Sequence, residues 1–400
     1  MRKIKVGLLV EEFYDSDLGG FGGYGILARE YIAKYIPNSE IEIEVILGSN
    51  KEKKVKTVER DGIKIYFLPK NYSSKYNIDF IYFYLVKKFF KEKNFDIYLS
   101  VEMSKIAYEV MRIEKSKKLI MWIQDPRPKE DWEEIKTVSY SNEYESYLNY
   151  YKKWESRIQD ILKKLYEENR LILISQGEFL KKKARALYKF SDNLPIEYFP
   201  NPVEIKNNFD IKDKKDSIIF LGRLTAVKRP WIYFELAKEL PKYTFYVCGQ
   251  GEELKEIISK YKDVKNLKFM GHVAGEQKNK LLRECKILVN TSIHEAIPVS
   301  FLEAISYGQK IVSCQNPDNI TSENGYSTGV ILGDGYDRVE DFKIGVEKCL
   351  IEYNETEIRK AIERVKENHN IEKFKTKMRE LIKREGKNGK YKTNNSCSNI

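Results

Sequence analysis

Two glutamates in the second half of the chain have a spacing that would suit a phosphate-linked substrate. Glu295 and Glu303 are separated by seven residues, and Glu303 lies in a helical pattern that runs from Pro298 to Gly308. At about 1.5 Å of rise per helical residue, the two carboxylates lie at most roughly 12 Å apart, about the span from a sugar through a diphosphate to a ribose. Free backbone amides at the helix start would point at phosphates between them. Taken alone, the pair could equally be one dipole-stabilising residue and one solvated residue.

Two cations follow a predicted strand earlier in the same half. Arg223 follows the apolar run Ile218–Leu221 after a single glycine, and Lys228 comes five residues after Arg223. An arginine grips phosphate oxygens with two prongs and a lysine adds a mobile point charge, so together they could neutralise a diphosphate. Either residue by itself could be an ordinary solvated surface charge.

A glycine-rich segment, Gly19–Gly25, precedes the first predicted helix. Written from Gly20 it matches the dinucleotide pattern G-x-G-x-x-G, but it begins well beyond the end of the strand Ile4–Val10. The second predicted strand closes in Gly48 and Ser49 without the acidic residue that would bind a ribose, so a dinucleotide site is disfavoured. The segment is then either a plain strand-to-helix turn or a loop whose amides approach phosphates.

Apolar runs alternate with polar-faced helical stretches along both halves, which predicts an α/β fold with two Rossmann-like, doubly wound domains facing a central cleft. The predicted strands of the first half are Ile4–Val10, Ile41–Leu47, Ile63–Leu68, Ile97–Val101, Leu119–Ile123 and Leu171–Ile174. Those of the second half are Ile218–Leu221, Thr244–Cys248, Leu267–Met270, Ile287–Asn290 and Lys310–Ser313. Ligands bind at the carboxyl ends of strands in such sheets, so the cleft between the domains is where we expect the site.

Pro200 and Pro202 interrupt the periodicity and the charged run Lys206–Asp216 follows, which places the domain boundary there. We predict an N-terminal domain over residues 1–200 and a C-terminal domain over 201–370. A helix at 371–385 would pack back on the first domain, and the tail 386–400 would be disordered. The insertion at 130–170 would form surface helices on the sheet, or else a lid or acceptor wall.

The composition bounds the class of protein. The 400 residues are 42% hydrophobic and 33% charged, which predicts a globular chain. No apolar run reaches the roughly 18 to 20 residues of a membrane helix, so we expect a cytoplasmic protein. A net charge of +11 favours anionic partners such as phosphates, nucleic acid or acidic lipid. Five cysteines without a C-x-x-C predict buried free thiols, and three histidines without ligand-like spacing predict no zinc site.

Four motifs in one order carry a family resemblance. They are the run Phe199–Val203, the element Gly222-Arg223-Leu224 with Lys228, the turn Gly249–Gly251, and the pair Glu295 and Glu303. Together they resemble the GT-B glycosyltransferases of family 4, strongly from about Phe199 to Gly308 and more weakly before it. The resemblance implies a retaining enzyme that moves a sugar from a nucleotide-sugar donor, by family base rates a UDP-sugar. The implied acceptor is a glycan, a lipid-linked molecule or a protein.

Carried over by position, the resemblance implies that Arg223 and Lys228 hold the donor diphosphate and act in catalysis with Glu295. Glu303 would accept hydrogen bonds from the ribose hydroxyls. Since two side-chain cations do the neutralising, no metal and no further cofactor are implied.

The same resemblance implies further donor contacts. The amides of Ala296 and Ile297 would address the sugar and its neighbouring phosphate, Val273 would lie beside the nucleotide base, and Gly22 and Gly23 would approach the donor when the cleft shuts.

One departure from the family pattern follows the predicted strand Leu119–Ile123. Many relatives carry a histidine there, whereas this chain has Gln124, which cannot titrate. Gln124 is then expected to bind the sugar, and the donor's own oxygen would take the acceptor proton. Asp125 is the alternative general base, and Arg127 would lie with it on the acceptor side.

Rival interpretations use other features. Asp15-Ser16-Asp17 spells the carboxylate pair of a metal-dependent GT-A glycosyltransferase, but it lies in a loop. A nucleotide-sugar epimerase would share the fold and the donor. A basic nucleic-acid-binding protein would use the net positive charge, but no nucleic-acid module is recognised and none is expected as a partner. The stretch Tyr82–Lys91 is either a half-buried helix or a contact with an anionic membrane, which would place the protein peripherally on the inner membrane face.

Overall fold

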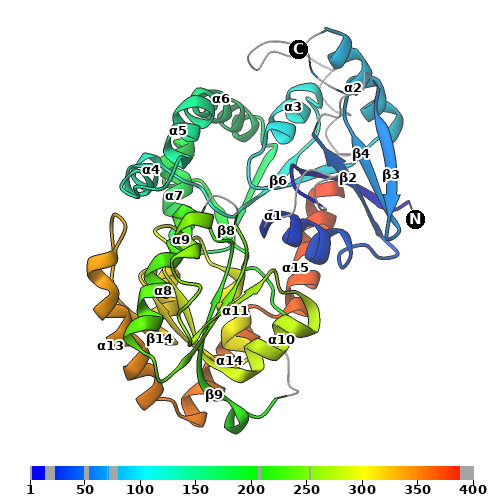
Figure 1. Cartoon of the computed structure of the whole chain (residues 1–400). Coiled ribbons are helices and arrows are strands. Elements are labelled where there is room, and N and C mark those ends of the chain that lie inside the picture. The colour runs from blue at the N-terminus through cyan, green and yellow to red at the C-terminus, as the bar shows by residue number, and fades with distance from the viewer. Residues whose placement is uncertain are drawn as a thin grey trace, which may run out of the picture.

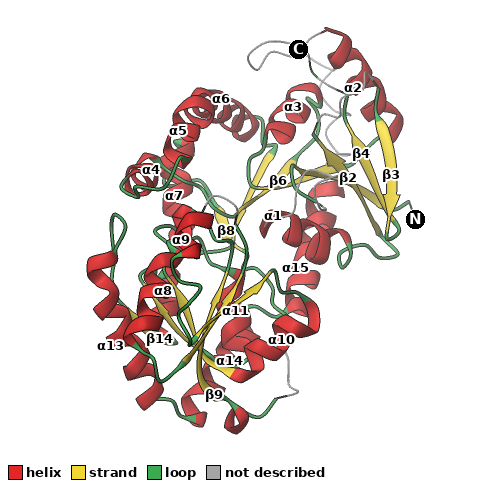
Figure 2. Cartoon of the chain, viewed as in Figure 1, coloured by secondary structure: helices red, strands yellow, loops and turns green. Residues whose placement is uncertain are grey.

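The computed structural model describes residues 2–13, 23–48, 54–69, 71, 80–205, 209–251 and 254–387 (Figure 1). Two parallel sheets with helices on both faces form two Rossmann-like domains (Figure 2), as the alternating pattern predicted. Gly22, Asp15, Asp17 and almost all of the tail predicted at 386–400 lie outside the described residues.

The N-terminal sheet has eight strands in the order β3-β4-β2-β1-β5-β6-β7-β8. Only the β3–β4 hairpin is antiparallel; the other neighbours are parallel. Its strands are β1 Ile4–Val10, β2 Ile41–Leu47, β3 Lys56–Arg60, β4 Ile63–Phe67, β5 Ile97–Val101, β6 Leu119–Ile123, β7 Leu171–Ser175 and β8 Ile196–Tyr198. Alternate strand residues are buried on opposite faces, as with Leu8 and Leu9, because helices cover both sides.

The helices of the first half follow the strands in the usual alternation. They are α1 Gly23–Ile26, continued by the π-helical turn η2 Leu27–Ala33, then α2 Phe80–Lys93, α3 Lys105–Ile113, α4 Lys129–Lys136, α5 Glu143–Ser146 with η3 Tyr147–Tyr151, α6 Lys152–Glu167 and α7 Glu178–Tyr188. Among the described residues no helix has both the length and the apolar character needed to cross a membrane.

The C-terminal sheet has six strands in the order β11-β10-β9-β12-β13-β14, and every pair is parallel. Its strands are β9 Lys215–Leu221, β10 Thr244–Cys248, β11 Leu267–Gly271, β12 Cys285–Asn290, β13 Lys310–Ser313 and β14 Gly325–Ser327. Its helices are α8 Pro230–Glu239, α9 Lys255–Ser259, α10 Gly275–Glu284, α11 Val299–Ser306, α12 Ile320–Glu323, α13 Val339–Ile351 and α14 Glu355–Asn368. Short 3-10 turns complete it: η4 Ile211–Asp213, η5 Ala226–Lys228, η6 Pro317–Asn319 and η7 Tyr336–Arg338.

The last helix, α15 Ile371–Lys387, returns to the first domain and contacts β1 and β5. Phe374, Met378 and Leu381 are buried in the same core as Val6 and Leu99. The chain therefore crosses between the domains twice, once after β8 and once before α15.

The insertion between β6 and β7 joins the two domains. Trp132, Ile135 and Val138 of the α4 region belong to the hydrophobic core of the C-terminal domain, whereas Leu162 of α6 belongs to that of the N-terminal domain. The Tyr140 ring lies 5.0 Å from the Trp231 ring of α8. The insertion therefore differs from helices lying only on their own sheet, because its apolar faces are divided between two cores.

Candidate active site

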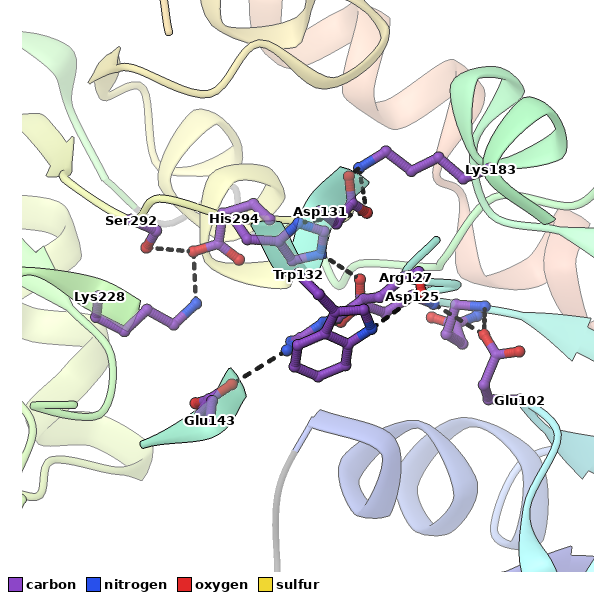
Figure 3. Close-up of polar contacts among 12 residues, drawn as sticks. Glu102, Asp125, Arg127, Asp131, Trp132, Glu143, Lys183, Lys228, Ser292 and His294 are labelled. Atoms are coloured by element: carbon purple, nitrogen blue, oxygen red, sulfur yellow. Dashed lines mark hydrogen bonds and ion pairs between the residues drawn. The ribbon is translucent and has the colours of Figure 1, made fainter. Parts of the chain in front are cut away.

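Loops from the carboxyl ends of both sheets meet in one region, shown in Figure 3. The loop after β12 comes from the C-terminal domain, and the turn after β6 comes from the N-terminal domain. The closest polar contact between them joins His294 to Asp125, with 2.7 Å between Nε2 and Oδ1. Because parallel strands end at one sheet edge, each domain offers several such loops to the cleft.

Glu295 and Lys228 form an ion pair at the base of this region. Lys228 Nζ lies 2.5 Å from Glu295 Oε1, which also accepts hydrogen bonds from Asn290 and Ser292 at 2.9 and 2.7 Å. Only 10% of the Glu295 side chain is exposed. Burial opposes its ionisation, but the Lys228 charge and the three hydrogen bonds outweigh burial, so the pKa of Glu295 lies below its usual value.

Arg223 is placed by a close approach of two backbones. A β-carbon added at Gly249 would lie 1.8 Å from the Gly222 carbonyl oxygen, and one at Gly251 would lie 1.9 Å from that of Leu224. Gly222 N–H and Leu224 N–H also donate to carbonyls of the facing turn. The two glycines of the turn after β10 are thus required for the segment that presents Arg223, whose side chain is exposed and forms no ion pair with a described residue.

Glu303 lies on α11 and pairs with a lysine that the sequence did not single out. Lys278 of α10 places its Nζ 2.7 Å from Glu303 Oε1. Tyr31 of η2 faces the same carboxylate from the other domain, since burial and then the charge of Glu303 raise the pKa of its phenol. Pro298 is the N-cap of α11, so it lies just before the first helical turn and not inside it as expected. Gly308 follows the end of the helix and has a φ of +75°.

Gln124 is buried among amides rather than directed at open space. Its Nε2 donates to Asn201 Oδ1 at 3.0 Å, and its Oε1 accepts from Asn201 Nδ2 at 3.1 Å. Asn201 Nδ2 also donates to Gln176, and Gln176 Nε2 donates to the Gln124 carbonyl. Both polar atoms of the Gln124 side chain are therefore satisfied inside the protein, beside the crossover at His369, whose Nδ1 lies 2.7 Å from the Asn201 carbonyl oxygen.

Asp125 uses both carboxylate oxygens. Oδ1 contacts His294, and Oδ2 lies 2.9 Å from Arg127, which in turn contacts Glu143 at 3.2 Å. Burial disfavours the charged form of Asp125, but the charges of Arg127 and His294 outweigh burial and hold its pKa well below the usual range. Glu102 supports this turn from β5, because its Oε2 accepts the backbone N–H groups of Gln124 and Asp125, both at 2.9 Å.

The remaining expected residues divide between the described and undescribed parts of the chain. Gly23 opens α1 and is exposed, Val273 is buried after β11, and Ala296 and Ile297 lie between Glu295 and α11. Among the described residues, no group of three His, Cys, Asp or Glu side chains is arranged to hold a metal ion.

Sequence reasoning missed several side chains that complete the region. Glu102, Asp131, Lys183 and Lys278 carry no motif, and only their spatial contacts single them out. His294 lies directly before Glu295 in the sequence, but this position alone does not indicate which groups it contacts.

The comparison with protein families matches residues 203–396 to the family described as glycosyl transferases group 1. Over these residues, which make up slightly less than half of the chain, the sequence is similar to the glycosyl transferases of group 1. Its sequence motifs from Gly222 to Glu303 all lie inside the matched range.

Curated relatives match over a short segment only. Two Escherichia coli proteins, the O-antigen biosynthesis glycosyltransferase WbnH and the probable O-antigen biosynthesis glycosyltransferase WbiN, are each 29% identical over 93 residues. That segment is 23% of this chain and 27% of theirs, so the match spans about a quarter of the relatives' length.

Solved structures match over nearly the whole chain. The sucrose-phosphate synthase of Thermosynechococcus elongatus has a TM-score of 0.70 at 12% identity, over 96% of this chain and 99% of that one. Anabaena Alr3699/HepE in complex with UDP-glucose has a TM-score of 0.65 at 13% identity, over 95% and 99%. The glycosyltransferase WaaG has a TM-score of 0.61 at 14% identity, over 94% and 99%. The chain therefore has the GT-B fold in both domains.

Proposed function

We propose that the chain is a retaining, metal-independent glycosyltransferase that moves a sugar from a UDP-sugar to a glycan acceptor carried on a lipid. The observation that carries the proposal is the buried Glu295–Lys228 pair at the base of the region where loops of both domains meet, inside the part of the chain that matches the group 1 family. A departing diphosphate needs a cation nearby, and a positively polarised sugar needs an ionised carboxylate. The Lys228–Glu295 pair offers both.

The roles follow from charge. Negative charge grows on the diphosphate as the sugar–phosphate bond breaks, and Arg223 and Lys228 would stabilise it with the amides of Ala296 and Ile297. Glu295 would steady the sugar as it becomes positive. Glu303 would bind the ribose, and Lys278, its present partner, would turn toward the nucleotide.

The surroundings of Asp125 support the donor oxygen as the acceptor of the proton. A general base works best with a pKa near the working pH, whereas Asp125 is paired with Arg127 and His294 and its pKa is held far below that range. Gln124 cannot titrate and its amide is engaged by Asn201, so we propose it as a structural residue rather than a sugar ligand. A retaining reaction in which the donor oxygen takes the acceptor proton needs no side-chain base, which is compatible with the low pKa of Asp125.

The comparisons support the choice of donor and acceptor. Similar structures were solved with UDP-glucose in Alr3699/HepE and with UDP and GlcNAc in the pneumococcal O-GlcNAc transferase GtfA. WbnH is an O-antigen enzyme and WaaG takes part in lipopolysaccharide biosynthesis.

Helix α2 supports a peripheral position on an anionic membrane surface. The stretch Tyr82–Lys91 is part of a half-buried helix, because Tyr82, Val86 and Phe90 are buried on the side of α2 that faces the sheet. Its outer face nevertheless leaves Phe80 and Ile81 82% and 69% exposed, beside exposed lysines. An apolar turn followed by cations suits the boundary of an acidic lipid layer, from which a lipid-linked acceptor would be reached at the cytoplasmic side.

The test is UDP release from UDP-glucose, UDP-galactose and UDP-N-acetylglucosamine, with GDP- and ADP-sugars as matched controls and each reaction repeated with a chelator. We expect one UDP-sugar to be turned over, with chelator-resistant activity, and the same sugar to raise the melting temperature. At 100 times its dissociation constant, a ligand stabilises the fold by about 2.7 kcal/mol. Isomerised donor without UDP release would instead indicate an epimerase, and no response to any nucleotide sugar would refute the proposal.

A further inference from the structure

His294 lies between two carboxylates of the other domain. Its Nε2 is 2.7 Å from Asp125 Oδ1, and its Nδ1 is 3.6 Å from Asp131 Oδ2 (Figure 3). Only 3% of the His294 side chain is exposed. A buried ring with one nitrogen at hydrogen-bond distance from a carboxylate and a second carboxylate near the other nitrogen is held in a defined orientation, and both carboxylates belong to the N-terminal domain.

The carboxylates are themselves fixed. Asp131 lies on α4 and is bound by Lys183 of α7 at 2.8 Å, while Asp125 is bound by Arg127. Burial raises the pKa of Glu134 of α4, and the charge of His294 acts on that pKa in the opposite direction. The described charged groups around the His294 ring therefore come from the turn after β6, from α4 and from α7. Most of these groups are paired with one another.

The N-terminal domain also contacts residues that follow His294. Ala296 packs against the hydrophobic core of the N-terminal domain. A β-carbon added at Gly177, at the start of α7, would lie 2.9 Å from Ile297 Cδ1 and 2.9 Å from Asp318 Oδ2. Asp318 of the C-terminal domain accepts the N–H groups of Glu178 and Phe179 at 2.7 and 2.8 Å. His294, Ala296 and Ile297 of this loop therefore contact the other domain, whereas Glu295 pairs with groups of its own domain.

We propose that His294 is a positioning residue: by clasping Asp125 and Asp131 it sets the loop that carries Glu295 and the amides of Ala296 and Ile297. The inference rests on the proposed function for its effect on transfer, although its structural part stands on the contacts alone. UDP binding would draw mainly on the side chains of Arg223, Lys228 and Glu303 and only in part on the amides of Ala296 and Ile297, so loss of the clasp should weaken binding less than transfer. Sugar transfer needs it because misplacing a reacting group by about 1 Å costs on the order of 100-fold in rate.

The experiment compares full-length His294→Ala and His294→Gln with the native chain. We expect His294→Ala to lower the kcat for UDP release about 10- to 100-fold while the UDP dissociation constant changes by less than about twofold. His294→Gln keeps one N–H donor that can reach Asp125, so it should recover part of the loss. Asp125→Asn combined with His294→Ala should be no slower than the slower single variant, because both remove the same contact. Asp192→Asn, an exposed carboxylate of the N-terminal domain, serves as the control.

Hydrogen exchange separates this proposal from the proposed function. Amide exchange in residues 293–297 and at the start of α7 should become faster in His294→Ala, with or without activity. Native-like exchange there, or equal losses in UDP affinity and kcat, would overturn the clasp. If the native chain turned over no nucleotide sugar, the proposed function would fail. The exchange result would still show whether His294 positions the loop. If His294→Ala did not fold, His294→Gln and Asp125→Asn would supply the same comparison.

Discussion

At the scale of residues, the site is a set of buried charges that are each compensated. Burial alone would push the pKa of Glu295 and of Asp125 upward, yet both lie below their usual values because a cation contacts each carboxylate. Leaving such a group without its partner is costly, since an unpaired charge in a buried position loses its solvation. The function of each carboxylate therefore depends on the cation beside it.

Replacing Lys228 tests this dependence. Lys228→Met removes the charge that keeps Glu295 ionised and that would neutralise the diphosphate, so UDP release should fall by about 10² to 10³. UDP affinity should also weaken, which separates this variant from those of His294. The exposed Lys212→Met is a matched control in the same domain. Unchanged turnover in Lys228→Met would contradict the assignment.

Asp125 predicts a pH effect on stability. Its folded pKa is depressed, so the stability it contributes is fully present above its unfolded pKa of about 4 and is lost as pH falls below that value. The native chain should be more stable than Asp125→Asn at pH 6, and the difference should shrink by pH 3. Urea-unfolding midpoints at both pH values measure it; a difference that grows in acid would show the sign to be wrong.

At the scale of elements, one helix depends on a cap from the other domain. Gly177, the N-cap of α7, offers no side chain, and the Asp318 carboxylate takes its place by accepting two amide hydrogens of the helix. Asp318 itself has φ of +44°, a conformation that aspartate and asparagine tolerate better than most residues. The cap thus binds an N-domain helix to the loop after β13.

Removing this cap should destabilise the chain modestly. Asp318→Ala should cost about 0.5 to 2 kcal/mol of unfolding free energy, because two helix amides lose their acceptor. Asp318→Asn keeps one side-chain acceptor and tolerates the backbone angle, so it should lose less. Urea unfolding monitored by circular dichroism compares them, and equal losses in both variants would show that the cap needs both carboxylate oxygens or their charge.

At the scale of the whole molecule, three segments tie the domains together. The crossover after β8, the returning helix α15 and the insertion each bury apolar or amide groups at the junction.

The returning helix should be essential to the first domain. Met378 is fully buried in the core that contains β1, so Met378→Ala should cost about 2 to 5 kcal/mol. Thr376→Ala, exposed on the same helix, should change stability little. Urea denaturation measures both; equal stabilities would contradict the packing of α15 as a core element.

The sequence by itself determined the class of fold and the order of its elements. Buried parallel strands such as β1, β6 and β10 are continuous apolar runs, so their periodicity is visible without a structure. It missed β3, β8 and β14, because an edge strand such as Lys56–Arg60 is charged and exposed and the other two have only three residues each. Local sequence patterns therefore reveal strands that are buried on both faces, but they do not reveal short or exposed strands at the sheet edge.

The motif residues Glu295, Lys228, Arg223 and Glu303 could likewise be named from type and spacing. Only the tertiary structure decided their partners: Lys278 beside Glu303, the closed amide pair of Gln124 and Asn201, and His294 between two carboxylates of the other domain. These contacts join residues far apart in the chain, and their energies depend on distance and burial, which no local pattern records.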